Sequence, residues 1–154
     1  KRSLIIGYPF TFQEVVGKEM DTSCDLAVCG VDNNETRKYV SQFYYKKGIP
    51  VVFTAVSEDA SHGYVFVQEK GKACFGCLFP KALNDDLEPC PNTPAVKDIL
   101  KVVSGIVLYA VDSLIMERKR NWNYKEVFLA GFVPDTNRIV ERRKNCPLCQ
   151  GVKN

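Results

Sequence analysis

Two nearly continuous apolar runs in the first half of the chain predict a pair of buried strands joined by a helix. The first run, residues 25–32, reads DLAVCGVD and stops at polar residues that favour a helix N-terminus. The helix that follows has apolar residues on one face and closes at Gly48. Residues 49–56 form the second run. Runs without polar alternation are typical of parallel strands buried on both faces, so this unit predicts a right-handed βαβ crossover.

Shorter patterns on either side extend this unit into an α/β fold with parallel strands followed by antiparallel strands. Four further strands are predicted from short apolar runs at residues 4–6, 64–67, 124–133 and 138–142. Residues 95–116 repeat apolar positions every three or four residues, which predicts a long helix. Because that helix is apolar on most faces, we expect it to be largely buried. The fold expected is a Rossmann-like half with a second, antiparallel part.

Composition narrows the class of protein. The 154 residues are 45% hydrophobic and 25% charged, values typical of one soluble globular domain. A net charge of +3 gives no basic stripe, so we expect no nucleic-acid partner. No apolar stretch reaches the roughly 18 residues of a membrane span. The first residues are neither an initiator Met nor a signal peptide, so the chain is interpreted as a piece of something longer.

Seven cysteines suit a reducing, cytoplasmic location better than a secreted disulfide scaffold. Four of them form two C-x-x-C pairs, Cys74 with Cys77 and Cys146 with Cys149. Two such knuckles complete a tetrahedral zinc site with four cysteine ligands, which would be structural because it leaves no open coordination position. Two disulfides, a redox pair or unrelated cysteines remain the alternative interpretations. A zinc site would join the end of the chain to its middle.

Several of these segments together resemble the ThiF/MoeB/HesA family. Residues 25–37 resemble the family's Asp-Asn-x-x-x-Arg segment, and residues 49–56 look like the strand that comes next. Residues 74–80 resemble the first zinc knuckle of the family. Residues 102–106 look like part of its Val-Ile-Gly-Ser helix, and the second knuckle follows after two strands. The order of the motifs makes the resemblance specific.

The resemblance implies a part of an ATP-dependent adenylyltransferase that activates the C-terminal carboxylate of a ubiquitin-like or sulfur-carrier protein. ATP and Mg²⁺ would be its cofactors beside structural zinc, and a homodimer is the expected assembly. The chain contains no G-x-G-x-x-G sequence and no P-loop, which the family carries in an N-terminal half. Residues 1–154 are therefore predicted to be a single domain, the C-terminal portion of the adenylation domain, without the N-terminal nucleotide loop.

The resemblance also implies roles for residues after the first buried strand. Asp32 would bind Mg²⁺, which needs only one or two carboxylates when phosphates supply the other ligands; otherwise it begins a helix without touching a ligand. Asn33 would either bind the nucleotide or cap the helix. Arg37 would clamp a phosphate or the substrate carboxylate, or else form a surface ion pair with Glu35 or Glu14.

Cys90 lies close to where sulfur-transfer members of the family carry a reactive cysteine. A thioester or persulfide on Cys90 is one expectation, and an unreactive loop thiol is the other, because the neighbouring Asp85, Asp86 and Glu88 would raise its pKa. His62 is the only histidine and is predicted to lie at the surface rather than to act in catalysis.

Two other functions remain open. Adenylation of a small peptide would use the same chemistry on another carboxylate. A non-catalytic, zinc-stabilised module for interaction or dimerisation is favoured by the missing phosphate loop. A zinc-ribbon nucleic-acid binder fits poorly, because the two knuckles are far apart and the charge is nearly balanced.

Overall fold

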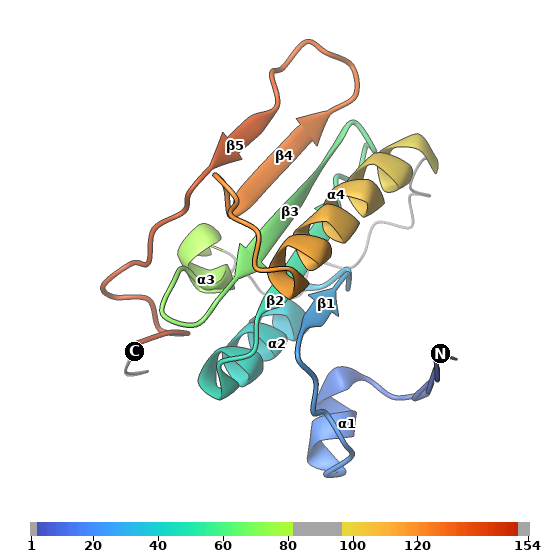
Figure 1. Cartoon of the computed structure of the whole chain (residues 1–154), viewed down its shortest axis with the longest axis vertical. Helices are drawn as coiled ribbons and strands as arrows, with labels where there is room; N and C mark the ends of the chain where they lie inside the picture. Colours follow the sequence, from blue (N-terminus) through green and yellow to red (C-terminus); the bar gives the residue numbers. More distant parts are fainter. Residues whose placement is uncertain (1–2, 82–96, 151–154) are drawn as a thin grey trace.

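A five-stranded sheet forms the centre of the computed structural model, which describes residues 3–81 and 97–150. The strands follow the chain order across the sheet: Ala27–Cys29 (β1), Val51–Val56 (β2), His62–Gln68 (β3), Tyr124–Phe128 (β4) and Thr136–Arg138 (β5) (Figure 1). β1 pairs with β2 in parallel, and the other three pairs are antiparallel. The predicted α/β class, with parallel strands followed by antiparallel strands, is confirmed.

Helices cover both faces of this sheet. The helices in the described residues are Phe12–Gly17 (α1), which packs on the next helix rather than on the sheet, Asn34–Lys47 (α2), Phe75–Leu78 (α3) and Lys97–Ile115 (α4). α2 connects the two parallel strands and lies with α3 against one face, whereas α4 crosses the other face (Figure 1). The predicted strand–helix–strand unit is therefore present.

Alternating side chains of β2 and β3 build two cores, one on each face. Phe53 and Phe66 belong to the core beneath α2 and α3, and Val52 and Val65 belong to the core beneath α4. All four side chains are fully buried. Each such side chain contributes about 1.5–3 kcal/mol when it leaves water, so the two central strands anchor the sheet.

α2 begins and ends where its sequence predicts. The Asn33 side chain accepts a hydrogen bond from the backbone N–H of Thr36 at 2.8 Å, which satisfies one free donor of the first turn. Gly48 ends the helix at φ 74°, in the left-handed region that glycine adopts without strain. These caps fix the position of residues 32–37 relative to β1.

The first predicted strands differ most from the structure. Residues 4–6 form no strand; they are exposed coil, because no neighbouring strand is there to pair with them among the described residues. The run 25–32 contributes only Ala27–Cys29 to the sheet. The expectation that this strand is buried on both faces was wrong, since Val28 is 53% exposed. β1 is an edge strand, so one side of its backbone has no partner in the described part of the chain.

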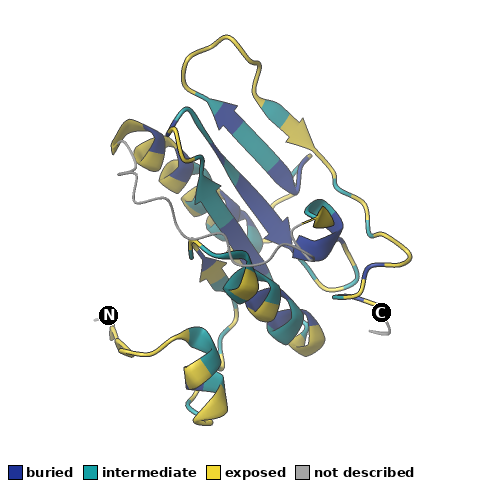
Figure 2. Ribbon diagram, turned by 180° about the vertical axis from the view of Figure 1, so that it is seen from behind, coloured by how far each residue is buried: buried dark blue, intermediate teal, exposed yellow. Residues whose placement is uncertain are grey.

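α4 is amphipathic rather than buried on most faces. Ile99, Val103 and Ala110 pack against the sheet, whereas Leu108 and Tyr109 are exposed. Buried and exposed positions alternate along this helix (Figure 2). The expectation of a largely buried helix was wrong because only one layer, the sheet, covers α4 in the described residues. No helix in residues 3–81 and 97–150 has the length and apolar character required to span a membrane.

The last hairpin is shorter than predicted. β4 ends at Phe128 and β5 covers Thr136–Arg138, so residues 129–133 and 139–142 lie outside the strands. Asp135 closes the loop by accepting a hydrogen bond from the backbone N–H of Phe128 at 3.1 Å. β5 is the last strand of the sheet in the part of the chain that the structure describes.

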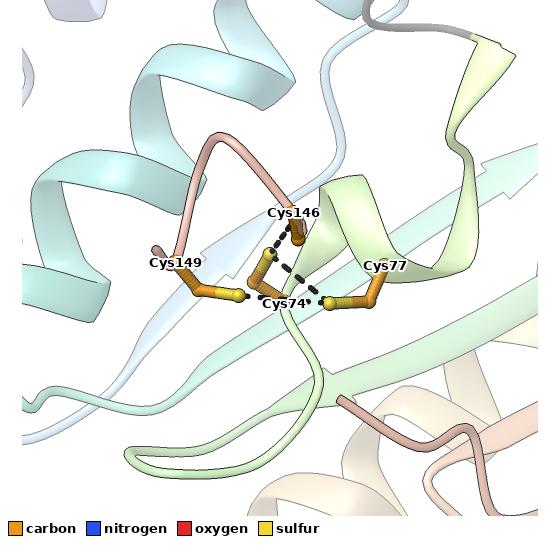
Figure 3. A group of neighbouring side chains, drawn as sticks. All are labelled: Cys74, Cys77, Cys146 and Cys149. Carbon is orange, nitrogen blue, oxygen red and sulfur yellow. Dashed lines mark hydrogen bonds between the residues drawn. The ribbon is translucent and has the colours of Figure 1, made fainter. Parts of the chain in front are cut away.

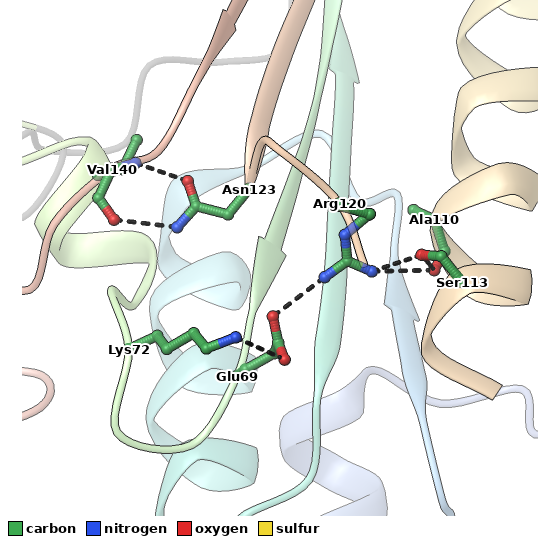
Figure 4. Close-up of polar contacts among 7 residues, drawn as sticks. All are labelled: Glu69, Lys72, Ala110, Ser113, Arg120, Asn123 and Val140. Carbon is green, nitrogen blue, oxygen red and sulfur yellow. Dashed lines mark hydrogen bonds and ion pairs between the residues drawn. The ribbon is translucent and has the colours of Figure 1, made fainter. Parts of the chain in front are cut away.

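Arg120 ties the C-terminal part of α4 to the sheet. Its guanidinium donates to Glu69 Oε2 at 3.0 Å and to Ser113 Oγ at 2.6 Å (Figure 4). Its side chain is only 6% exposed, so the ion pair with Glu69 is partly shielded from water. Because the charge of Arg120 would be left largely buried without Glu69, these contacts help to fix the helix on the sheet.

Candidate functional site

The four cysteines of the two C-x-x-C pairs converge on one point. All four are buried, and their Sγ atoms lie within 4.8 Å of one another (Figure 3). Cys74 Sγ lies 3.7 Å from Cys77 Sγ and 3.4 Å from Cys146 Sγ. Cys77 Sγ lies 3.6 Å from Cys149 Sγ. Each knuckle therefore contacts the other.

These distances fit a tetrahedral metal centre better than disulfides. Four Zn–S bonds of about 2.3 Å require sulfur–sulfur separations of about 3.8 Å. A disulfide would require about 2.05 Å. The hydrogen bond with Cys77 and burial raise the pKa of Cys74, whereas the hydrogen bond from Cys74 lowers the pKa of Cys77 to about 4. Four crowded thiols cannot all ionise unless a cation neutralises them, so the donor set suits Zn²⁺.

A buried glutamine positions the first knuckle. Gln68 Oε1, at the end of β3, accepts hydrogen bonds from the Phe75 backbone N–H at 3.1 Å and from Ser41 Oγ at 2.6 Å. Its amide donates to the Ser41 carbonyl at 3.0 Å. The Gln68 side chain thus joins α2, β3 and the turn that begins at Cys74. Sequence patterns did not identify this residue, because a single glutamine at the end of an apolar run looks like a surface position.

Gly76 allows the two knuckles to approach. A Cβ atom at this position would lie 3.1 Å from Cys146 Sγ and 3.0 Å from Leu148 Cδ1. The second knuckle therefore packs directly on the glycine. Gly76 matters here because it has no side chain to keep the second knuckle away.

Polar contacts also hold the segment that leads to the second knuckle. Asn123 binds both backbone groups of Val140, donating to the carbonyl at 2.9 Å and accepting from the N–H at 2.6 Å (Figure 4). Further along, the backbone N–H of Arg143 donates to Cys77 Sγ at 3.4 Å. Arg142 donates to the Cys149 carbonyl at 2.6 Å. The cluster is thereby held by contacts from both the middle and the tail of the chain.

A cavity of about 630 Å³ lies at the other end of α2, where the parallel strands β1 and β2 end. Asp32 and Arg37 line it on one side, and Ser57 and Glu58 line it after β2. Val103, on the inner face of α4, contributes to its apolar wall. The carboxyl edge of parallel strands is where open α/β sheets bind ligands.

The three residues predicted around the start of α2 are neighbours in space. Asn33 caps the helix, and its amide nitrogen lies 3.4 Å from Asp32 Oδ1. Arg37 donates to the Val31 carbonyl at 2.6 Å and to Asn34 Oδ1 at 3.1 Å. No ion pair of Arg37 with Glu14 or Glu35 is formed in the described part of the chain. Arg37 is therefore held at the cavity rather than at the outer surface of the helix.

Two further residues, Cys90 and His62, were considered from the sequence. Cys90 falls outside the described residues. His62 begins β3, where it lies 3.8 Å from Glu126 and stacks on Phe128 with ring centroids 5.0 Å apart. The expected surface position of His62 agrees with its half-exposed side chain.

Comparison with known proteins places these features in a family. The model of the ThiF family matches residues 4–148. No curated protein matches the chain. The match covers both C-x-x-C pairs except for Cys149, and it includes Asp32, Asn33 and Arg37.

Solved structures of MccB share the fold. The structure of E. coli MccB with AMPCPP and MccA superposes with a TM-score of 0.67 at 11% identity, covering 94% of this chain and 43% of that chain. E. coli MccB with ATP gives a TM-score of 0.61 at 12% identity, covering 81% of this chain and 39% of that one.

A third structure, described as the microcin C7 biosynthetic enzyme MccB in complex with N-formylated MccA, gives a TM-score of 0.59 at 13% identity. It covers 81% of this chain and 41% of that chain. The chain thus spans less than half of the length of these MccB structures. At this identity the likeness shows a shared fold alone.

Proposed function

Because the chain belongs to the ThiF family, we propose that it is part of an ATP-dependent adenylyltransferase that activates a carboxylate of a peptide or small protein. The observation that supports this function most is the meeting of Asp32 and Arg37 in one cavity at the carboxyl edge of the parallel strands. A carboxylate and a guanidinium at such an edge are the groups that a nucleotide–metal complex and an anionic substrate require.

The reaction joins a substrate carboxylate to AMP. One carboxylate oxygen attacks the α-phosphorus of ATP, the bond from that phosphorus to the bridging oxygen breaks, and pyrophosphate leaves with the electron pair. Mg²⁺, when bound, neutralises charge on the phosphates. Asp32 would hold that ion, since a hard cation with phosphate ligands needs few protein carboxylates.

Arg37 would orient the two anionic reactants. Its guanidinium is already fixed by the Val31 carbonyl and the Asn34 side chain, so little side-chain freedom would be lost on binding. A planar guanidinium can contact two oxygens of a carboxylate or phosphate at once. Asn33 would mainly hold the helix start in place, with a nucleotide contact from its amide group as a further prediction.

The substrate carboxylate belongs either to a ubiquitin-like or sulfur-carrier protein or to a short peptide. The family supports the first class in general. The MccB structures, crystallised with MccA, support the second. Homodimerisation and a cytoplasmic location are proposed on the family resemblance and on the free cysteines.

The cluster of four cysteines would bind one structural Zn²⁺. Its role is to join the tail of the chain to the turn after β3, away from the cavity at the start of α2. Cys90 would form a thioester after adenylation, its thiolate attacking the acyl carbon of the acyl-adenylate while AMP leaves with the electron pair of the broken C–O bond. Replacing Cys90 by Ala should then leave pyrophosphate release unchanged and abolish any covalent carrier adduct seen by mass spectrometry; loss of pyrophosphate release itself would contradict this assignment.

A non-catalytic interaction module is the second candidate. The exposed edge strand β1, with Val28 half uncovered, supports it because unpaired strand edges readily pair with another chain. In that case the intact protein would bind a partner without consuming ATP.

Pyrophosphate release by the intact protein distinguishes the two candidates. The assay would contain ATP, Mg²⁺, hydroxylamine and peptides with a free C-terminal carboxylate, so that an acyl-adenylate is trapped as a hydroxamate. An adenylyltransferase yields pyrophosphate and hydroxamate in equal amounts. If neither product forms and equilibrium dialysis detects no binding of ATP, the result would favour the interaction module.

A further inference from the structure

A second cavity shares Arg37 with the first but opens on the opposite face of the sheet. Its volume is about 550 Å³. Tyr64, Leu78 and Phe79 form apolar walls, and all three pack against the core beneath α2 and α3. The first cavity is instead walled by Val103 and other residues of α4. Arg37 therefore stands at the point where the two cavities meet.

Aromatic rings give the second cavity fixed walls. The rings of Tyr64 and Phe79 lie with centroids 5.2 Å apart. Phe79 also packs on Phe75 at 5.2 Å, and Tyr64 packs on Tyr124 at 5.9 Å. Because these rings hold one another, the cavity is preorganised to accept an apolar group of comparable size.

Two cationic side chains also line this cavity. They are Arg37 and Lys81. Burial raises the pKa of the Tyr64 hydroxyl, and the charge of Arg37 partly opposes this rise, so the two side chains lie near each other. The Arg37 Nε donor is buried and has no hydrogen-bond partner among the described residues. The cavity thus combines an apolar interior with cationic groups.

We propose that this cavity binds the C-terminal residue of the carboxylate substrate, with a large apolar side chain between Tyr64 and Phe79 and the carboxylate on Arg37. The inference rests on the proposed function, in which that carboxylate meets ATP beside Asp32. A substrate ending in glycine would leave the apolar walls uncovered. The substrate class is therefore a peptide with a free carboxylate on an aromatic or large aliphatic residue, rather than a carrier with a glycine terminus.

Calorimetric titration of the intact protein without ATP tests this binding site. The three probes are N-acetylglycyl-L-phenylalanine, its C-terminal amide, and N-acetylglycylglycine. We expect the phenylalanine acid to bind at least about tenfold more tightly than either of the others, because one lacks the charge and the other lacks the side chain. Equal affinities for the three probes, or no binding of the phenylalanine acid, would overturn the proposal.

Single-residue variants test separately the preference for a free carboxylate and the preference for a large side chain. Arg37→Gln should remove the difference between the acid and the amide, and Phe79→Ala should remove the difference between phenylalanine and glycine. Tyr64→Phe should retain both preferences because it keeps the ring. Lys46→Gln, which removes an exposed charge from the same helix, serves as the matched control. Circular dichroism of each variant separates lost binding from lost folding.

Pyrophosphate release with the same probes separates this site from the proposed function. Selective binding of the phenylalanine acid without pyrophosphate release would retain the cavity and reject adenylation of this substrate. Equal release with the phenylalanine and glycine acids would retain adenylation and reject the cavity. If pyrophosphate release is greatest with the probe that binds most tightly, the result supports both the binding site and the proposed function.

Discussion

At the residue scale, the start of α2 concentrates the candidate chemistry. Asn33 uses its side-chain oxygen to cap the helix, while Asp32 just before it and Arg37 one turn later line the same cavity. A helix N-terminus favours negative charge, so an anionic ligand beside Arg37 would also gain from the helix dipole. One short segment can therefore supply both a metal ligand and an anion clamp.

Replacing Asp32 by Ala should reduce pyrophosphate release by about 100-fold or more, because a charge-stabilising group at the reacting phosphates is lost. The fold should persist, since Asp32 is exposed. Glu35→Ala, an exposed carboxylate in the first turn of the same helix, is the matched control and should retain activity. Activity of Asp32→Ala equal to that of the control would remove Asp32 from the mechanism.

At the scale of elements, the close packing of α4 on β3 depends on one glycine. A Cβ atom at Gly63 would lie 2.7 Å from Val103 Cγ2 and 2.9 Å from the Ala55 carbonyl oxygen. Real Cβ atoms do not approach so closely, so any side chain there would displace the helix or the neighbouring strand. The same helix contains Gly105, where a Cβ would meet open space.

Gly63→Ala should lower the free energy of unfolding by about 1–3 kcal/mol through this clash. Gly105→Ala should raise it by about 0.5–1 kcal/mol, because alanine restricts the unfolded chain and favours helix. Urea denaturation of both variants provides the comparison. Equal effects of the two substitutions would show that α4 does not pack on β3 in this way.

The stability contributed by the turn between β2 and β3 should fall at acid pH. Hydrogen bonds from Ser57 and Ser61 lower the pKa of Asp59 from its ordinary value of 3.8 to about 2. A depressed folded pKa stabilises the fold above pH 3.8, and this contribution disappears as pH falls through about 2. In urea titrations, Asp59→Asn should therefore have a lower free energy of unfolding than the parent at neutral pH. This difference should shrink as the pH approaches the folded pKa of Asp59. A difference that stays constant with pH would show that the Asp59 carboxylate is not its cause.

At the scale of the whole molecule, the cysteine cluster joins segments far apart in the chain. Cys74 and Cys77 follow β3, whereas Cys146 and Cys149 follow the last strand of the sheet. A metal ion bound there would restrict the unfolded chain and link the antiparallel part of the sheet to α2 and α3. The tail after β5 has no other regular structure within the described residues to hold it.

Cys146→Ser should abolish the binding of one zinc ion per chain and lower the free energy of unfolding by about 4 kcal/mol or more, a size typical of losing a metal. The melting temperature should fall by roughly 10 °C. Elemental analysis after dialysis and calorimetry measure the two effects. Cys24→Ser, at a half-buried cysteine outside the cluster, should retain the metal. A Cys146→Ser protein that keeps its zinc would disprove the shared site.

Features that depend on local pattern could be predicted from the amino-acid sequence. The apolar runs identified β2, β3 and the strand–helix–strand unit, and the spacing of the cysteines identified the cluster. The cap at Asn33 and the end at Gly48 were also readable, because both depend on backbone hydrogen bonds within a few residues. The order of the motifs was sufficient to indicate the ThiF family.

Which faces of the elements are covered, and which side chains meet, could be seen only in the folded chain. Val28 and Leu108 have apolar side chains but lie at an edge and on an outer face, and hydrophobicity alone cannot report what layer lies opposite. Gln68 acts on the first cysteine knuckle, and Arg37 joins two cavities, through contacts between segments distant in sequence. Such positions depend on long-range packing, which local periodicity does not encode.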